Sequence, residues 1–131
     1  MLSLNKKTDY GLRLMIALAK KYKKGPSSLK QMARENKLPF KFLEQAAFLL
    51  RMAGLIDSKE GKSGGYFLTK SPGKISMGTI IEALEGPVGF DHHCTGCPEF
   101  GLCGQKDVMD EVELQVKKTI KAKTLKELIE K

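Results

Sequence analysis

The sequence predicts a mainly α-helical protein with a small β-hairpin wing, arranged as a winged helix-turn-helix followed by a long dimerisation helix. Apolar residues recur at helical spacing over residues 12–50, glycines interrupt strand-like residues over 55–70, and a second helical stripe covers residues 108–120. The 131 residues are 41% hydrophobic, which is enough for one small core. A chain of this size gains stability from assembling with a second copy.

Three stretches in the first part of the chain have the apolar spacing of helices. These stripes are Leu12, Met15, Ile16, Ala19 and Tyr22, then Leu29, Met32 and Ala33, then Leu43, Ala46, Ala47 and Leu50. Gly25 and Pro26 end the first helix. Ser28 and Gln31 have capping-box spacing at the start of the second helix, and Pro39 suits the first position of the third. Short turns between the stretches predict a helix-turn-helix.

A β-hairpin is predicted after Gly54, where the third helix ends. Residues 55–70, LIDSKEGKSGGYFLTK, contain two strand-like runs separated by a loop with Gly61, Gly64 and Gly65. Beside a helix-turn-helix such a hairpin is a wing, and the two elements together can probe DNA in a groove and along its backbone. The alternative is a small α+β domain whose helices only pack on each other.

The charge is unevenly distributed along the chain. Residues 1–75 carry 16 Lys or Arg against 5 Asp or Glu, a balance of +11, while residues 76–131 carry 7 against 10, a balance of −3. A basic first part attracts a polyanion, and an acidic second part keeps away from phosphates. The alternative is a lysine-rich solvated surface, because charge alone is weak evidence for nucleic-acid binding.

The cysteines are clustered. Cys94, Cys97 and Cys103 are the 3 cysteines of the chain, within the stretch FDHHCTGCPEFGLCGQ. In a reducing compartment, thiols this close together hold a metal or cluster more often than a disulfide. Their thiolates suit zinc and iron-sulfur clusters alike. A fourth ligand is needed, from Asp91, His92, His93 or elsewhere in the fold or in a second subunit.

A long amphipathic helix is predicted after the cysteines. Its apolar stripe is Val108, Met109, Val112, Val116 and Ile120, and Thr124 and Glu127 have capping-box spacing before a short final helix. Because little else remains for the stripe to pack on, we expect a homodimer. The sequence lacks a run of about twenty apolar residues and the pattern of a signal peptide. It also lacks a catalytic triad or phosphate loop, so we expect a cytoplasmic protein without a membrane partner that is not an enzyme.

The chain resembles the Rrf-two-type winged-helix transcription regulators, which include the iron-sulfur regulator IscR and the nitric-oxide sensor NsrR. The motifs that carry the resemblance are TDYGLRLM at 8–15, FLEQ at 42–45, LLRMAGLI at 49–56, GKSGGYFLTK at 61–70, IIEALEGP at 80–87 and the cysteine cluster. The resemblance covers nearly the whole chain. It implies a DNA-binding regulator that acts as a repressor or an activator.

The resemblance also implies which residues contact DNA. They are Lys41, Glu44 and Gln45 of the third helix, which enters the major groove, and Lys59 and Lys62 of the wing. Glutamine can pair with adenine, glutamate can accept from cytosine, and lysine suits guanine or phosphate. Glu60 stands where IscR-like proteins carry a wing arginine, so the resemblance does not imply IscR-like target sequences. The alternative for Glu44 and Gln45 is a solvated helix face.

For the cofactor, the resemblance favours an iron-sulfur cluster, 2Fe-2S or 4Fe-4S, over zinc. Its ligands are then Cys94, Cys97 and Cys103, although the first two lie closer together than in the family. Lys106 replaces a histidine that IscR-like proteins use as a ligand. NsrR-like members use an aspartate in the first helix that reaches the cluster of the partner subunit, and Asp9 stands at that place. The alternatives are that Asp9 is a surface or capping residue, or that His92 or His93 is the fourth ligand.

Together these expectations describe a homodimeric DNA-binding transcription regulator that senses redox state, nitric oxide or iron-sulfur status. Residues 1–85 are expected to form the DNA-binding domain, 86–104 the cluster-binding loop, and 105–131 the dimerisation helix and C-terminal helix. The operator is expected to be double-stranded and near-palindromic. The alternative is a structural zinc protein that binds DNA constitutively or serves as an adaptor.

Overall fold

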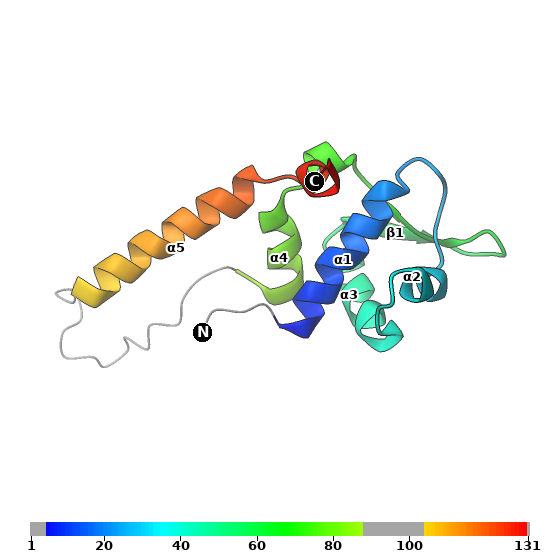
Figure 1. Ribbon diagram of the computed structural model, residues 1–131, viewed down its shortest axis with the longest axis horizontal. Helices are drawn as coiled ribbons and strands as arrows, with labels where there is room; N and C mark the ends of the chain where they lie inside the picture. The colour runs from blue at the N-terminus through cyan, green and yellow to red at the C-terminus, as the bar shows by residue number, and fades with distance from the viewer. Residues whose placement is uncertain (1–4, 88–103, 131) are drawn as a thin grey trace.

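Short helices and a β-hairpin form the body of the protein, and one long helix projects from it (Figure 1). The computed structural model describes residues 5–87 and 104–130. The elements are α1 (Lys6–Lys20), α2 (Leu29–Glu35), α3 (Phe40–Met52), β1 (Ile56–Lys59), β2 (Gly65–Leu68), the 3-10 turn η1 (Pro72–Lys74), α4 (Met77–Glu85), α5 (Gly104–Ala122) and α6 (Leu125–Glu130). This order confirms the predicted mainly α-helical fold with a hairpin wing.

Local hydrogen bonds explain where the first helices begin. The Asn5 side chain accepts from the Thr8 backbone N–H at 2.8 Å, and α1 starts at the next residue after Asn5. The Ser28 hydroxyl accepts from the Gln31 N–H at 3.0 Å, as the predicted capping box requires. The Gln31 side chain, however, donates to Glu35 at 2.8 Å, so the reciprocal bond of the box is replaced. Pro39 is the N-cap residue of α3 rather than its first helical residue, so the helix begins at Phe40, one residue later than expected.

The hydrophobic core lies where α1 crosses α3 and α4. The predicted apolar stripe of the third helix is buried throughout, with Leu43, Ala46, Ala47 and Leu50 at most 1% exposed. Gly11 allows α1 to approach α4 closely, because a Cβ there would lie 2.6 Å from a methyl carbon of Leu84. The helical stripes were therefore predicted correctly in this part of the fold.

The final helix belongs to this core, which the sequence pattern did not indicate. Leu125 is fully buried, and its backbone N–H donates to the Ile75 carbonyl at 2.8 Å. The Met77 N–H donates to the Lys123 carbonyl at 2.8 Å, which ties the same segment to the start of α4. The predicted cap is also present, since the Glu127 N–H donates to the Thr124 hydroxyl at 3.4 Å. The chain therefore returns to the first domain after α5.

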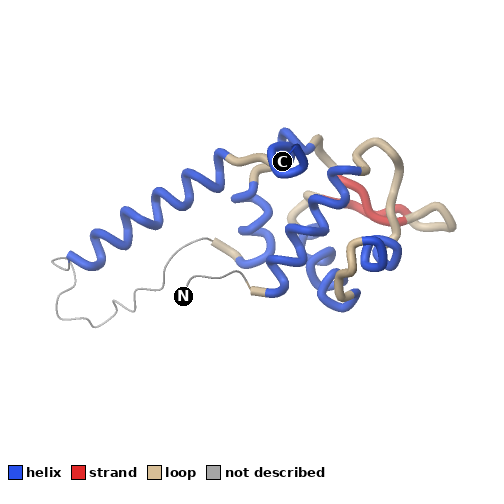
Figure 2. Tube along the Cα trace, in the orientation of Figure 1, coloured by secondary structure: helices blue, strands red, loops and turns tan. Residues whose placement is uncertain are grey.

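The hairpin is antiparallel, with Ile56 opposite Leu68 and Lys59 opposite Gly65. Figure 2 shows its red strands at the end of the molecule opposite the first residues of α5. Tyr66 and Ser27 exchange backbone hydrogen bonds of 2.8 and 2.9 Å, which attach β2 to the connection between α1 and α2. The wing is therefore fixed to the helix-turn-helix.

Helix α5 is the exposed element of the fold. None of its residues is buried, and the apolar side chains Val108, Val112 and Val116 are 57%, 40% and 38% exposed. The end of α5 rests on α4, where Ile120 and Lys121 lie beside Gly78. A stripe of this kind in water is the expected signature of a helix that packs on a second copy. Among the described helices, none has the length and apolar character to cross a membrane.

Candidate nucleic-acid interface

The outer face of α3 presents polar and charged side chains to solvent. Lys41, Glu44 and Gln45 are exposed, whereas the opposite face of the helix is buried in the core. The α3 residues Lys41, Glu44, Gln45, Phe48 and Leu49 line a shallow depression, and Lys7 of α1 borders it. We call these six residues the α3 face. They form one continuous surface built from two helices.

The polar groups of the α3 face are available for an external partner. Within the described ranges, Lys41, Glu44 and Gln45 make no hydrogen bond or ion pair with the rest of the chain. In contrast, the Arg51 guanidinium contacts the Asp57 carboxylate at 3.4 Å and links the end of α3 to β1. Arg51 therefore supports the helix, while the predicted contact residues keep their hydrogen-bonding capacity.

The tip of the hairpin is a second exposed and charged element. Lys59, Glu60 and Lys62 are all exposed at this tip. The Gly61 φ of 114° permits the reversal of direction in the loop between the strands. A lysine on each side of Glu60 leaves the tip with a net positive charge, which suits contact with phosphate.

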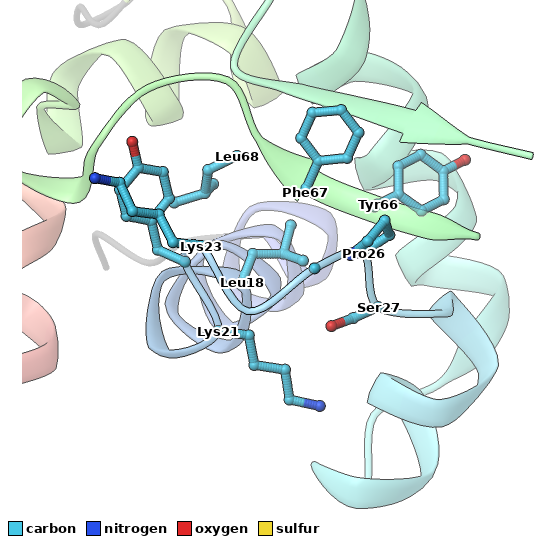
Figure 3. A pocket seen from close by; sticks show the side chains of 10 residues that line it. Leu18, Lys21, Lys23, Pro26, Ser27, Tyr66, Phe67 and Leu68 are labelled. Atoms are coloured by element: carbon cyan, nitrogen blue, oxygen red, sulfur yellow. The ribbon is translucent and has the colours of Figure 1, made fainter. Parts of the chain in front are cut away.

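Behind the hairpin, a mostly apolar cavity of about 360 Å³ separates β2 from the end of α1. Figure 3 shows Leu18, Phe67 and Leu68 around it, with the Lys21 side chain directed towards α2. There the Lys21 ammonium donates to Glu35 at 2.9 Å, which holds the pKa of this carboxyl below its ordinary value. The ion pair and the backbone bonds of β2 together join wing, α1 and α2.

Asp9 is the described member of the candidate ligand set. It lies in the first turn of α1, and its Oδ1 accepts from Arg13 Nε at 3.1 Å. Its side chain is 46% exposed, and Asn5 rather than Asp9 caps the helix. Cys94, Cys97 and Cys103, like Asp91, His92 and His93, lie outside the described residues.

The helix that carries Asp9 also packs on α4, the last described element before the cysteine segment. Gly11, two positions further along α1, packs against Leu84 of α4, whereas Asp9 lies about half a turn away on the exposed side of α1, beside Arg13. The described part of the chain gathers no group of three or more metal-ligating side chains. The described DNA-contact candidates on α3 therefore share one face, while the Asp9 carboxylate is paired with Arg13 on α1.

Three residues of the α3 face, Lys7, Phe48 and Leu49, were not among the predicted contact residues. Phe48 is 64% exposed, and Lys7 reaches the depression from α1. Phe48 could have been found from its helical spacing, because it follows Gln45 by three positions and Lys41 by seven. The position of Lys7 depends on how α1 crosses α3, which no local pattern shows.

A family model described as Rrf2, iron-dependent transcriptional regulator, matches residues 4–131. The chain belongs to the Rrf2 family. It is 47% identical over 87 residues to the HTH-type transcriptional regulator CymR of Bacillus subtilis, a stretch that covers 66% of this chain and 63% of that protein. It is 31% identical over 126 residues to the HTH-type transcriptional regulator NsrR of Halalkalibacterium halodurans, covering 93% of this chain and 86% of the relative.

Solved structures of the family have the same fold. The structure of CymR, described as the global cysteine regulator of B. subtilis, matches with a TM-score of 0.86 and 37% identity, covering 99% of this chain and 98% of that chain. The structure of T. potens IscR matches with a TM-score of 0.82 and 33% identity, covering 98% and 87%. The protein is thus an Rrf2-family transcriptional regulator. Because the relatives are regulators, the expectation that it is not an enzyme is confirmed.

Proposed function

We propose that the protein is a homodimeric transcription regulator that binds operator DNA through the α3 face and the tip of the hairpin. The observation that carries this proposal is the unpaired polar surface of α3 in the basic part of the chain. Helix α3 follows α2 after a short turn, and the wing is fixed beside them by Ser27 and Tyr66. This arrangement suits insertion of α3 in the major groove, with residues 1–85 as the DNA-binding domain.

Each contact residue has a role that follows from its chemistry. The Gln45 amide can donate to and accept from one adenine, and the Glu44 carboxylate can accept from the amino group of cytosine. Lys41 suits a guanine edge or a phosphate, and Lys59 and Lys62 suit phosphates beside the wing. The interface thus contains side chains that select bases and side chains that position the protein on the DNA backbone.

The exposed stripe of α5 supports assembly as a dimer through this helix. Val108, Val112 and Val116 recur at intervals of four residues and are all exposed. Packing the stripes of two copies removes them from water and relates the copies by a two-fold axis. Two α3 helices related in this way contact two half-sites of opposite direction, so we propose a near-palindromic operator.

We further propose that residues 86–104 hold an iron-sulfur cluster through Cys94, Cys97 and Cys103, with Asp9 as the fourth ligand. Thiolates and one carboxylate are a donor set that suits such a cluster. When bound, it would supply an inorganic centre that oxidants or nitric oxide can alter. Asp9 is the candidate because its carboxylate lies half-exposed on the outer side of α1, where a group from the partner subunit can reach it. Any change at Asp9 acts on α1, which packs directly on α3.

DNA binding can be tested on an operator selected from random duplexes by the purified protein. Lys59→Ala and Lys62→Ala should each weaken binding, and each lysine that contacts a phosphate should lower the slope of log affinity against log salt by about one unit. Glu60→Gln is the matched control, because it changes charge at the same tip without removing a cation. Unchanged affinity and slope in both lysine variants would contradict the proposed contact of the wing.

The cofactor can be tested by the ultraviolet-visible spectrum of protein purified without oxygen. Visible absorption with bound iron and sulfide is expected, and Cys94→Ala, Cys97→Ala and Cys103→Ala should each lose it, because the chain has no spare cysteine. A colourless protein with stoichiometric zinc would favour the structural zinc site. A colourless protein without metal would favour a second candidate function, a transcription regulator without a cluster. The similarity to CymR, described as a global cysteine regulator, supports this candidate.

A further inference from the structure

A large apolar side chain on the outer face of α3 is uncovered by the described part of the chain. Phe48 is 64% exposed and shares the shallow depression with Lys41, Glu44 and Gln45. An aromatic ring in water forgoes the burial that usually stabilises it, so an exposed phenylalanine among polar contact residues indicates a partner. The ring follows Gln45 by three helical positions and therefore lies on the same side of α3.

We propose that Phe48 contacts the C5-methyl group of a thymine in the major groove and so selects an A·T base pair of the operator. This inference rests on the proposed DNA-binding function. Among the groups that base pairs present in the major groove, the thymine methyl is the apolar one, and phenylalanine is a suitable partner for it. Phe48 would thus add apolar recognition to the hydrogen bonds of Glu44 and Gln45.

Charge favours DNA over a second copy of the chain as the occupant of the α3 face. Lys7 and Lys41 border the depression that contains Phe48. The two lysines outnumber Glu44, the carboxylate in this depression, so a two-fold contact centred on Phe48 would bring two surfaces of like net charge together, which is electrostatically unfavourable. A polyanion instead complements both lysines and the balance of +11 over residues 1–75.

The helix geometry sets the position of the thymine. Three residues of an α-helix rise by about 4.5 Å, and successive base pairs are about 3.4 Å apart. Phe48 therefore lies about one base-pair step along α3 from Gln45, and the thymine is expected within two steps of the adenine that Gln45 contacts. Met52, which is 73% exposed, lies a further turn along the helix and serves as a matched apolar control.

The test replaces each thymine of the selected operator in turn by deoxyuridine, which lacks the methyl group. The wild-type protein should bind one such operator about fourfold more weakly than the thymine operator, the change expected for one methyl group removed from water. Phe48→Ser should bind both operators equally, while Phe48→Leu should keep part of the preference. Met52→Ser should show the wild-type ratio. Circular dichroism and the oligomeric mass should stay unchanged in all three variants, because both side chains are exposed.

Several outcomes would overturn the inference. One is a wild-type protein that binds every deoxyuridine operator as tightly as the thymine operator, and another is a Phe48→Ser variant that retains the fourfold ratio. Equal loss of preference in Met52→Ser would show a general effect of apolar surface. Dissociation of Phe48→Ser to monomers would show that the ring packs on a second copy. If the wild-type protein selected no DNA sequence at all, the proposed DNA-binding function itself would be wrong. The other outcomes would contradict only the role of Phe48.

Discussion

Gly65→Ala tests how the wing is attached to the helix-turn-helix. Gly65 has a φ of 148°, and a Cβ at this position would overlap the carbonyl carbon and oxygen of Ser27 and lie 2.7 Å from the Ser28 nitrogen. These are backbone atoms, so the overlap can be relieved only by moving β2 away from the α1–α2 connection. The hydrogen bonds between Ser27 and Tyr66, at 2.8 and 2.9 Å, would then be lost.

The cost can be estimated from these contacts. Each lost backbone hydrogen bond costs about 1 kcal/mol, and a residue forced into a φ that suits glycine costs about 1–3 kcal/mol. Gly65→Ala should therefore lower the free energy of unfolding by about 3–5 kcal/mol. Gly61→Ala is the matched control, because Gly61 has a φ of 114° and no atom within 4 Å of its added Cβ. Gly61→Ala should lower the free energy of unfolding only by the cost of the unfavourable φ, about 1–3 kcal/mol.

Urea unfolding followed by circular dichroism measures both variants. The effect of alanine on the unfolded chain is similar at the two sites, so it cancels in the difference between them. At an m-value of about 1–3 kcal/mol per molar urea, a difference of about 2 kcal/mol separates the midpoints by about 1 M. If Gly65→Ala cost no more than Gly61→Ala, the close approach of β2 to Ser27 would be refuted.

Three further predictions concern the core, the candidate ligand and the dimer. The Thr8 hydroxyl is buried without a hydrogen-bond partner in the described structure. Thr8→Val should therefore raise the free energy of unfolding by about 1 kcal/mol in the same urea experiment. A lower free energy of unfolding would contradict this prediction. Asp9→Ala should alter the visible spectrum of the loaded protein while His92→Ala and His93→Ala leave it unchanged; the opposite pattern would move the ligand into the loop. Val112→Lys should yield the monomer mass of 14.5 kDa in light scattering, and a persistent dimer would exclude the α5 stripe as the interface.

Local pattern was sufficient to predict the elements of the DNA-binding domain. Leu43, Ala46 and Leu50 repeat at helical intervals, and burying them on one side of α3 leaves Glu44 and Gln45 on the other. The hairpin followed from glycines between strand-like runs. These predictions succeeded because each depends on residues close together in the sequence.

Contacts between distant segments could not be predicted in this way. Leu125 completes the core by bonding to Ile75, a residue in a different part of the chain, and no periodicity in either segment indicates the pairing. Phe48 was missed because its residue type suggests burial, whereas the packing of α3 turns it outward. Gln31 has capping-box spacing, yet its side chain bonds to Glu35, since both partners are available on the same helix face.

Whether the α3 face selects bases in operator DNA can be measured by comparing the sequences that the wild-type protein and Gln45→Ala select from random duplexes. The account predicts that the variant loses its preference for adenine at one position of each half-site, a change of about 5- to 150-fold in relative affinity, and keeps its other preferences. Identical selected sequences and affinities for both proteins would contradict the docking of α3 in the major groove.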